Sequence, residues 1–174
     1  YSGNDLVIHR EDYRAPVYQI SEVALEVWLG PDHTEVESRL CFQRVSRSPV
    51  DALHLDGESL ELLSIRRDGQ ILSEDAYQLD ETGLTLLNPP DGFVLETRVS
   101  VAPAANSSLS GLYYAGGQFL TQCEAEGFRR ITYYLDRPDC LARFTVTLHG
   151  SRKTCPVLLA NGNCVATGDD EEGM

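Results

Sequence analysis

The residues Thr121–Asp139, TQCEAEGFRRITYYLDRPD, break the pattern of the sequence around them. On both sides, apolar and β-branched residues alternate with polar ones, which is typical of β-strands. Inside the segment, acidic residues, arginines and aromatic residues are crowded together. Such a charged segment stays ordered where its charges pair, and ordered loops on a rigid scaffold often carry functional sites. The alternative is an ion-pair cluster that only holds a long connection against a sheet.

The rest of the chain predicts short strands separated by frequent turns. Apolar and polar residues alternate along 22–29 and 36–42, and the intervening Gly30–His33 has the composition of a turn, so these two strands are expected to form an antiparallel hairpin. Further strands are expected at 52–55, 60–66, 70–72, 84–87, 93–101 and 144–148. Asn161–Gly162, between two short apolar runs, predicts a two-residue hairpin turn.

Helix is nearly absent from this pattern. One or two helical turns are expected over 136–142, where Pro138 would occupy an early helical position. The predicted fold class is therefore all-β, as an antiparallel two-sheet sandwich or saddle with at most one short helical turn. Within it, residues 1–14 are a polar arm, 15–168 form the β domain, and 169–174 are an acidic end at which we expect the domain to be truncated.

Composition limits the classes of function. The chain has 174 residues, enough for one domain with its own core, and a net charge of −13. That charge argues against nucleic acid and against an anionic membrane surface as partners. No apolar run approaches the roughly 20 residues of a transmembrane helix, and the first residues lack the basic, apolar and small-residue pattern that is typical of a leader peptide. The five cysteines show no C-x-x-C spacing, which favours a reducing compartment and a cytoplasmic location.

The run from Thr121 to Phe144 resembles the N-terminal domain of the zinc aminopeptidase N family, the gluzincin aminopeptidases. The similarity is greatest to the branch that carries Thr-Gln-Cys-Glu-Ala-x-Gly-Phe-Arg-Arg-Ile-Thr-Tyr-Tyr-x-Asp-Arg-Pro-Asp. Fainter features of the family lie at 13–18, 111–113 and 158–163, so the resemblance covers nearly the whole chain. It implies an all-β domain that packs beside a zinc-binding catalytic domain of the same parent chain and contributes one wall of its active site. It also implies that the parent releases N-terminal amino acids from peptides.

Two residues of the segment are the candidate substrate-binding residues. On an extended strand Gln122 and Glu124 would point the same way, with Cys123 on the opposite face. By the resemblance, Glu124 anchors the ammonium group of a peptide N-terminus, and Gln122 lines the first side-chain subsite. Charge-assisted bonds to a free amine would explain why one residue is removed from the chain end. The structural alternative is that Glu124 only pairs with Arg129 or Arg130.

The other charged residues of the segment are expected to form a scaffold, because alternating charges over a short span favour an ion-pair network. These residues are Glu126, Arg129, Arg130, Asp136, Arg137 and Asp139. Tyr133 and Tyr134 would point opposite ways if extended, so one is expected in the core and the other against the catalytic domain.

The sequence predicts no metal site and no catalytic residue in this chain. Zinc capture on a helix needs H-E-x-x-H, and the four histidines are scattered at His9, His33, His54 and His149. The zinc of the parent enzyme is therefore expected outside this chain, which should be inactive alone. Truncation is expected to leave an unpaired sheet edge that favours self-association.

Two functions from other classes compete with this interpretation. In a glycosidase, Glu124 and Glu126 would act as acid and nucleophile, which in retaining enzymes lie about 5 Å apart. No aromatic sugar platform accompanies them. A β-sandwich module that binds protein or carbohydrate without catalysis is the second alternative. An H-E-x-x-H motif later in the same gene would distinguish the aminopeptidase from both.

Overall fold

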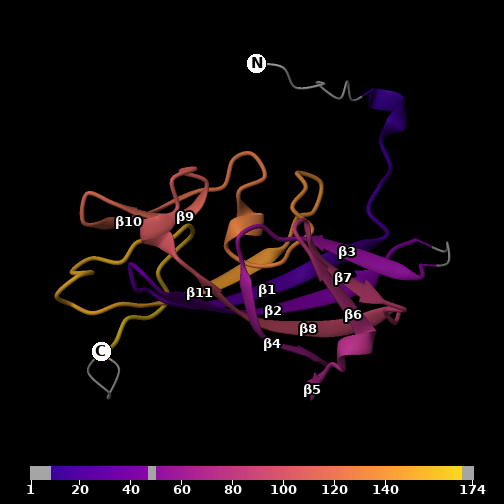
Figure 1. Cartoon of the computed structure of the whole chain (residues 1–174), viewed down its shortest axis with the longest axis horizontal. Helices are drawn as coiled ribbons and strands as arrows, with labels where there is room; N and C mark the ends of the chain where they lie inside the picture. Colours follow the sequence, from indigo (N-terminus) through magenta and orange to yellow (C-terminus); the bar gives the residue numbers. More distant parts are fainter. Residues whose placement is uncertain (1–8, 47–49, 170–174) are drawn as a thin grey trace.

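The computed structural model describes residues 9–46 and 50–169, and these residues form mainly β-strands (Figure 1). The strands are β1 (Tyr18–Trp28), β2 (Thr34–Arg44), β3 (Ala52–Asp56), β4 (Glu61–Arg67), β5 (Gln70–Ile71), β6 (Tyr77–Asp80), β7 (Gly83–Leu87), β8 (Gly92–Val101), β9 (Gly111–Ala115), β10 (Gln118–Gln122) and β11 (Arg143–His149). In the same residues, helix is confined to the short 3-10 turns η1 (Arg10–Asp12), η2 (Glu74–Ala76), η3 (Pro103–Ala105) and η4 (Phe128–Arg130). The all-β prediction is confirmed.

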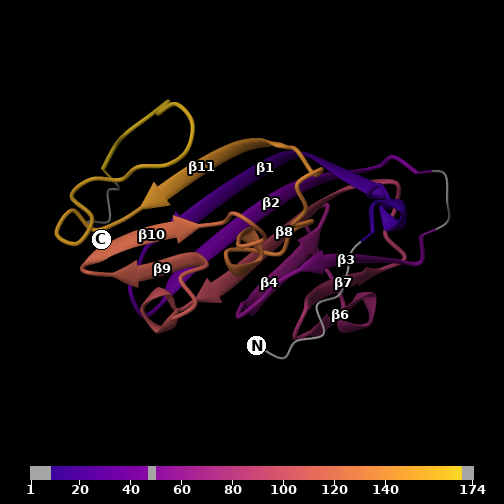
Figure 2. The ribbon, with the colours of Figure 1, turned by 90° about the horizontal axis from the view of Figure 1, so that it is seen from above.

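Three sheets make up the domain. The largest has the order β11-β1-β2-β8-β4-β5, and the smaller ones are β3-β7-β6 and β10-β9. Figure 1 shows β9, β10 and the segment around η4 on one side of the large sheet, and Figure 2 looks onto that side. The domain thus has layered sheets, with the Thr121–Asp139 segment lying over the inner face of the largest one.

The hairpin of β1 and β2 forms as predicted, with one irregularity. Its register shifts between Ile20 and Glu22, so an extra residue is inserted in β1. A bulge of this kind exchanges the two faces of a strand. Tyr18 and Ile20 are therefore buried before it, and Val23 and Leu25 after it, so the inner face stays apolar along the whole strand.

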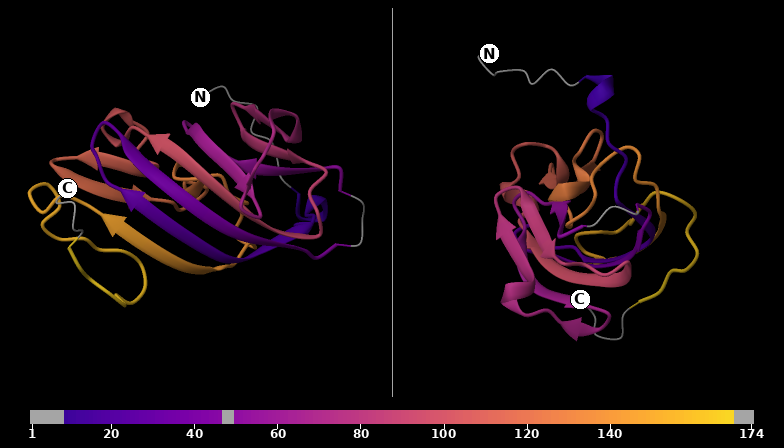
Figure 3. Two further views of the ribbon diagram at one scale, coloured as in Figure 1. Left: turned by 90° about the horizontal axis from the view of Figure 1, so that it is seen from below. Right: turned by 90° about the vertical axis from the view of Figure 1, so that its right-hand side faces the viewer.

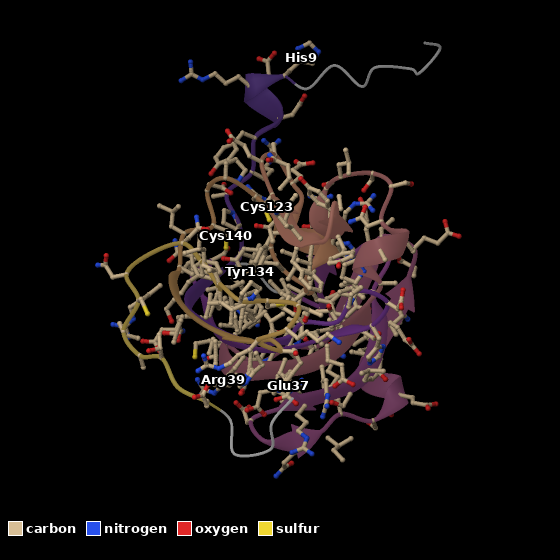
Figure 4. The ribbon with its side chains drawn as sticks, turned by 90° about the vertical axis from the view of Figure 1, so that its left-hand side faces the viewer. His9, Glu37, Arg39, Cys123, Tyr134 and Cys140 are labelled. Atoms are coloured by element: carbon tan, nitrogen blue, oxygen red, sulfur yellow. The ribbon has the colours of Figure 1, made fainter. Side chains whose placement is uncertain are left out.

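The outer face of the large sheet is charged. Arg98 pairs with Glu35 and Glu37, and Arg39 pairs with Glu96. Figure 4 places Glu37 and Arg39 on the opposite side of the molecule from Cys123, Tyr134 and Cys140. The sheet therefore has one solvated and one buried face, as the alternation of its strands predicted.

Strand β11 departs from the antiparallel prediction, because it pairs with β1 in parallel, Val23 opposite Phe144 and Trp28 opposite His149. Antiparallel neighbours can be joined by a short turn, whereas parallel ones need a long crossover. The strands β2 to β10 lie between β1 and β11 in the chain, and the last part of this crossover follows β10 and passes over the inner face before β11 begins.

Two local predictions were wrong. Residues 136–142 contain no helical turn, because the Asp136 amide donates to Asp56 Oδ2 at 3.1 Å and only a tight turn follows, closed by Cys140 N to Arg137 O at 3.2 Å. Residues 150–169 form no strand, so the hairpin at Asn161–Gly162 is absent. Val157 and Leu159 there are 70% and 85% exposed, and an isolated hairpin that buries no apolar face is marginal.

The ends of the chain lie mostly outside the described residues. Of the predicted arm, residues 9–14 are described; η1 and its flanks are exposed and stand away from the sheets (Figure 3). Of the predicted acidic end, only Asp169 is described, and it pairs with Arg152. Within the part of the chain that the structure describes, no helix is long and apolar enough to cross a membrane.

Candidate substrate-anchoring site

The β9–β10 hairpin carries Gln122 to the beginning of the candidate site. Its two-residue turn is Gly116–Gly117, both with positive φ (59° and 82°), which suits the twist of a hairpin. The ladder pairs Gly111 with Gln122, the last residue of β10, and Gln122 is exposed. The sequence analysis did not predict this hairpin, although the Gly-Gly pair between two short apolar runs was a signal for it.

Glu124 does not continue the strand, so the expected strand geometry of the candidate pair was wrong. Residues 123–127 form a tight turn in which Gly127 N donates to Cys123 O at 2.9 Å. A Cβ at Gly127 would lie 2.4 Å from Gln122 O, so only glycine fits there. The Glu124–Ala125 peptide is cis. The turn still brings the candidates together, because Gln122 Nε2 donates to the Glu124 carbonyl oxygen at 2.8 Å.

The carboxylate of Glu124 is exposed, and it makes no hydrogen bond or ion pair with any residue that the structure describes. The two arginines that could have neutralised it are paired elsewhere. Arg129 contacts other carboxylates, and Arg130 pairs with Glu58 at 2.5 Å. The structural alternative for Glu124, a simple ion pair within the loop, is therefore not what the chain forms.

Arg129 is the centre of an ion-pair network. Its Nε lies 3.0 Å from Asp136 Oδ2, and its two terminal nitrogens lie 3.6 Å from Asp56 Oδ1 and 3.5 Å from Glu126 Oε2. Burial lowers the pKa of Arg129, but the hydrogen bond that it donates to Asp136 and the neighbouring carboxylates raise the pKa by more, so the pKa ends above its ordinary value. The network expected from the alternating charges is present, and Glu126 belongs to it.

A second cluster connects the segment to the N-terminal arm. Arg137 Nε donates to Asp139 Oδ1 at 2.8 Å, and the Tyr13 hydroxyl donates to Asp139 Oδ2 at 2.8 Å. Arg137 also donates to the Arg14 carbonyl at 2.8 Å. The hydrogen bond from Arg137 lowers the pKa of Asp139 to about 2, against a small opposing effect of burial.

Beneath the charged loop, a buried hydroxyl network fastens the segment to the large sheet. Thr132 is fully buried and donates to Ser38 Oγ of β2 at 3.0 Å, and Ser38 lies 2.8 Å from Thr97 Oγ1 of β8. This network was not predicted from the sequence. Small hydroxyl residues on the apolar face of two strands were the available signal, because buried hydroxyls need partners.

Tyr133 and Tyr134 are both buried within this domain, at 4% and 5% exposure, so the expectation that one of them faces the catalytic domain was wrong. The Tyr133 ring fills the space above Gly57, where a Cβ would lie 2.5 Å from it. Tyr134 packs edge-on against Phe128, with ring centroids 4.9 Å apart. The reason is that the backbone here is not an extended strand, so successive side chains need not alternate.

The described residues offer no zinc site. They contain no group of three His, Cys, Asp or Glu side chains that could hold a metal ion. His33 is bound to Ser100 and Glu35, His54 to Thr85, and His149 to Glu26 while stacking on Trp28. The side chains present therefore do not fit the zinc that the family resemblance implies for the parent.

Two hollows in the described surface are lined by residues other than Gln122 and Glu124. One of about 320 Å³ is lined by residues that include Asn106, Leu112 and Arg130, and one of about 390 Å³ by residues that include His33 and Glu61. Neither contains a candidate residue. The candidate pair therefore lies on an open surface, which is suited to one wall of a cleft and not to a complete pocket.

Comparison with known proteins agrees with this architecture. Residues 23–174 match the model of the peptidase M1 N-terminal domain. The chain is 45% identical over 166 residues to aminopeptidase N of Escherichia coli and 43% identical over 166 residues to aminopeptidase N of Caulobacter vibrioides. In both comparisons the match covers 95% of this chain but 19% of the relative, so the chain spans about a fifth of the length of these relatives.

Solved structures show the same fold. The aminopeptidase A of Legionella pneumophila, in complex with aspartic acid, superposes with a TM-score of 0.87 at 32% identity, over 94% of this chain and 19% of that one. The M1 zinc metallopeptidase of Deinococcus radiodurans gives a TM-score of 0.63 at 18% identity, over 77% of this chain and 32% of that one, which supports the fold alone. Sequence match, fold and the layered sheets agree, and the chain belongs to the family of peptidase M1 N-terminal domains.

Proposed function

We propose that this domain anchors the N-terminus of a peptide in a zinc aminopeptidase, its parent chain. Glu124 binds the terminal ammonium group, and Gln122 lies beside the first side chain. The observation that carries the proposal is that Glu124 is unpaired among the described residues, while Arg129 and Arg130 are both engaged by other carboxylates. An exposed carboxylate held by a closed turn is available to a cationic partner from outside the domain.

The role of this wall is to position the substrate. Binding the ammonium group fixes the distance from the chain end to the first peptide bond, and such placement supplies a large part of a catalysed rate. Zinc would be held by the remainder of the parent, because the described residues do not fit it. The catalytic domain of the same parent chain would provide the opposite wall of the cleft.

The test is substitution of Glu124 in the full-length parent. In the parent, substrate and catalytic domain would bury the pair of Glu124 with the ammonium group, and removing one partner of a buried charge pair costs about 2–5 kcal/mol, which corresponds to a fall in kcat/KM of about 30-fold to several thousand-fold. Both Glu124→Ala and Glu124→Gln should show this loss, because glutamine keeps the shape of the side chain but not its charge. Kinetics on aminoacyl-anilide substrates, with melting temperatures of each variant, would measure it.

Glu37→Gln is the matched control, because Glu37 lies on the outer face and pairs with Arg98 at 3.3 Å. It should leave kcat/KM at the parental value. Parental kcat/KM in Glu124→Gln, with or without a lower melting temperature, would refute the anchoring role. The glycosidase alternative assigns equal roles to Glu124 and Glu126, whereas here Glu126 is held by Arg129 and Glu124 is not.

We also infer that the parent works in the cytoplasm. All five cysteines lie in described residues and none is in a disulfide. Oxidising compartments favour disulfides, whereas free thiols are ordinary in a reducing one. Cell fractionation with antibody detection would test this, and recovery of the parent with the periplasmic fraction would contradict it.

A further inference from the structure

We propose that Arg129 is the positioning residue of the substrate anchor: through its three carboxylate partners it holds the 123–127 turn in the orientation that presents Glu124 to the peptide. This inference rests on the proposed function of Glu124. Arg129 itself would not touch the substrate, because its guanidinium is already occupied and its side chain is only 18% exposed.

The three carboxylates that contact Arg129 come from three different parts of the fold. Asp56 ends β3, Asp136 lies in the crossover before β11, and Glu126 lies in the turn that contains Glu124. One cation therefore connects the small sheet, the crossover and the turn. Without it, the carboxylates of Asp136 and Asp56, which are only 11% and 27% exposed, would lie close together with no positive charge between them, which is unfavourable.

Hydrogen bonds hold both the backbone and the side chain of Arg129 in place. Its backbone amide donates to Asp136 Oδ2 at 3.1 Å, and its side-chain Nη2 donates to the Asp136 carbonyl oxygen at 3.2 Å. Asp136 in turn donates its amide to Asp56 Oδ2 at 3.1 Å, and Glu58 donates its amide to the Arg129 carbonyl at 3.0 Å. Side-chain and backbone bonds thus fix Arg129 to the end of β3 from both sides.

The position of the 123–127 turn depends on its contacts with Arg129 and with η4. The turn contacts Arg129 through the Glu126 carboxylate, which lies 3.5 Å from it and is 62% exposed, and it is joined to η4 by Arg130 N, which donates to Gly127 O at 3.2 Å. On its other side the Gln122 amide donates to the Glu124 carbonyl. Glu124 itself has no side-chain partner among the described residues, so its direction is set by the backbone of the turn.

The proposed role requires an arginine at position 129. A guanidinium offers five donors in a planar fork and can serve several carboxylates at once, whereas a lysine ammonium is a compact charge that would satisfy fewer of them. Arg129→Lys should therefore keep the positive charge but loosen the turn. A displacement of about 1 Å of a positioning group can cost about 100-fold in rate.

The experiment compares Arg129→Lys, Glu124→Gln and the double variant in the full-length parent. Arg129→Lys alone should lower kcat/KM by about 10-fold to 100-fold. In the Glu124→Gln background the same substitution should lower kcat/KM by less than about 3-fold, because the group that it positions has already lost its charge. A merely structural defect would lower kcat/KM by the same factor in both backgrounds.

Arg98→Lys is the matched control, since Arg98 also bridges two carboxylates, Glu35 and Glu37, but on the outer face. It should leave kcat/KM unchanged in either background. If Arg129→Lys does not fold, Asp56→Asn provides the same comparison from the β3 side, with a smaller loss that should also disappear in the Glu124→Gln background.

The outcomes separate the two proposals. If Glu124→Gln keeps the parental kcat/KM, the anchoring function fails, and the positioning role fails with it. Two outcomes overturn only the positioning role, provided that Glu124→Gln is impaired. Either Arg129→Lys retains the parental kcat/KM, or it lowers kcat/KM by the same factor in the Glu124→Gln background as in the wild type. Loss of kcat/KM confined to the background with an intact Glu124 supports the inference.

Discussion

At the scale of single residues, the site depends on which carboxylates are already neutralised. Asp136 and Glu126 are taken by Arg129, and Asp139 by Arg137, which leaves Glu124 as the available acid of the segment in the described structure. The proposed binding of a cation from outside the domain rests on this internal pairing. The sequence shows which charges are present, but the pairing pattern determines which of them can act.

Asp139 gives a pH-dependent prediction at this scale. Its pKa is lowered from 3.8 to about 2, chiefly by the hydrogen bond from Arg137, so its ionised form is favoured in the folded state. The stabilisation is therefore complete above about pH 4 and is lost as the pH falls towards about 2. The difference in free energy of unfolding between the wild type and Asp139→Asn, measured in urea, should shrink over that interval.

Tyr13→Phe is the partner variant for this measurement. The Tyr13 hydroxyl also lowers the pKa of Asp139, but by less than Arg137 does. Its removal should give a smaller difference from the wild type with the same direction of pH dependence. A difference for Asp139→Asn that stays constant from about pH 5 to about pH 2 would show that the Arg137–Asp139 pair does not stabilise the folded chain.

At the scale of elements, β11 stands out because it is an edge strand of the large sheet with exposed apolar side chains. It borders the large sheet beside β1, and within the described residues its outer edge has no strand partner. Phe144 and Val146 on this strand are 45% and 38% exposed. An edge strand with exposed apolar side chains is a template for pairing with another chain.

We therefore expect the isolated chain of residues 1–174 to self-associate through β11. Val146→Lys should reduce association, because a lysine on an edge strand blocks pairing. Sedimentation velocity over a range of protein concentrations would measure the change. Ile71→Lys, at the opposite edge of the same sheet, is the control and should leave association unchanged; a wild-type chain that stays monomeric throughout would contradict the expectation.

At the scale of the whole molecule, the proposed function makes this domain one wall of a cleft in the parent. Gln122 at the end of β10 and Glu124 in the turn that follows are both exposed, and neither lines the two hollows described above. The layered sheets and the buried hydroxyls around Thr132 give that wall a rigid base. Rigid support of this kind is what a positioning group requires.

The isolated chain should therefore show no peptidase turnover and should bind no stoichiometric zinc. The reason is that its described residues bring no three metal-binding side chains together. Chelator-treated chain would be loaded with zinc, desalted, and examined by metal analysis and with aminoacyl-anilide substrates, with the full-length parent as the positive control. One tightly bound zinc accompanied by turnover would contradict the prediction.

The sequence by itself determined the all-β class, the β1–β2 hairpin, the charged and apolar faces of the large sheet, and the family. These follow from local information, since alternation, turn residues and a long motif are readable without knowing what lies nearby in space. The ion-pair network around Arg129 was also predictable in outline, because alternating charges over a short span must be paired if the segment is ordered.

Only the tertiary structure decided the parallel pairing of β11, the burial of both Tyr133 and Tyr134, and the turn that takes Glu124 off the strand. Each depends on partners far away in the sequence: β1 for the strand, Gly57 for one ring, and Asp56 for the arginine that supports the turn. Apolar residues form a strand at 143–149, where β1 offers a ladder, whereas the short apolar runs within 157–165 form none and stay largely exposed in the described structure. Local pattern states a preference, and the free energy of burial and pairing decides whether it is realised.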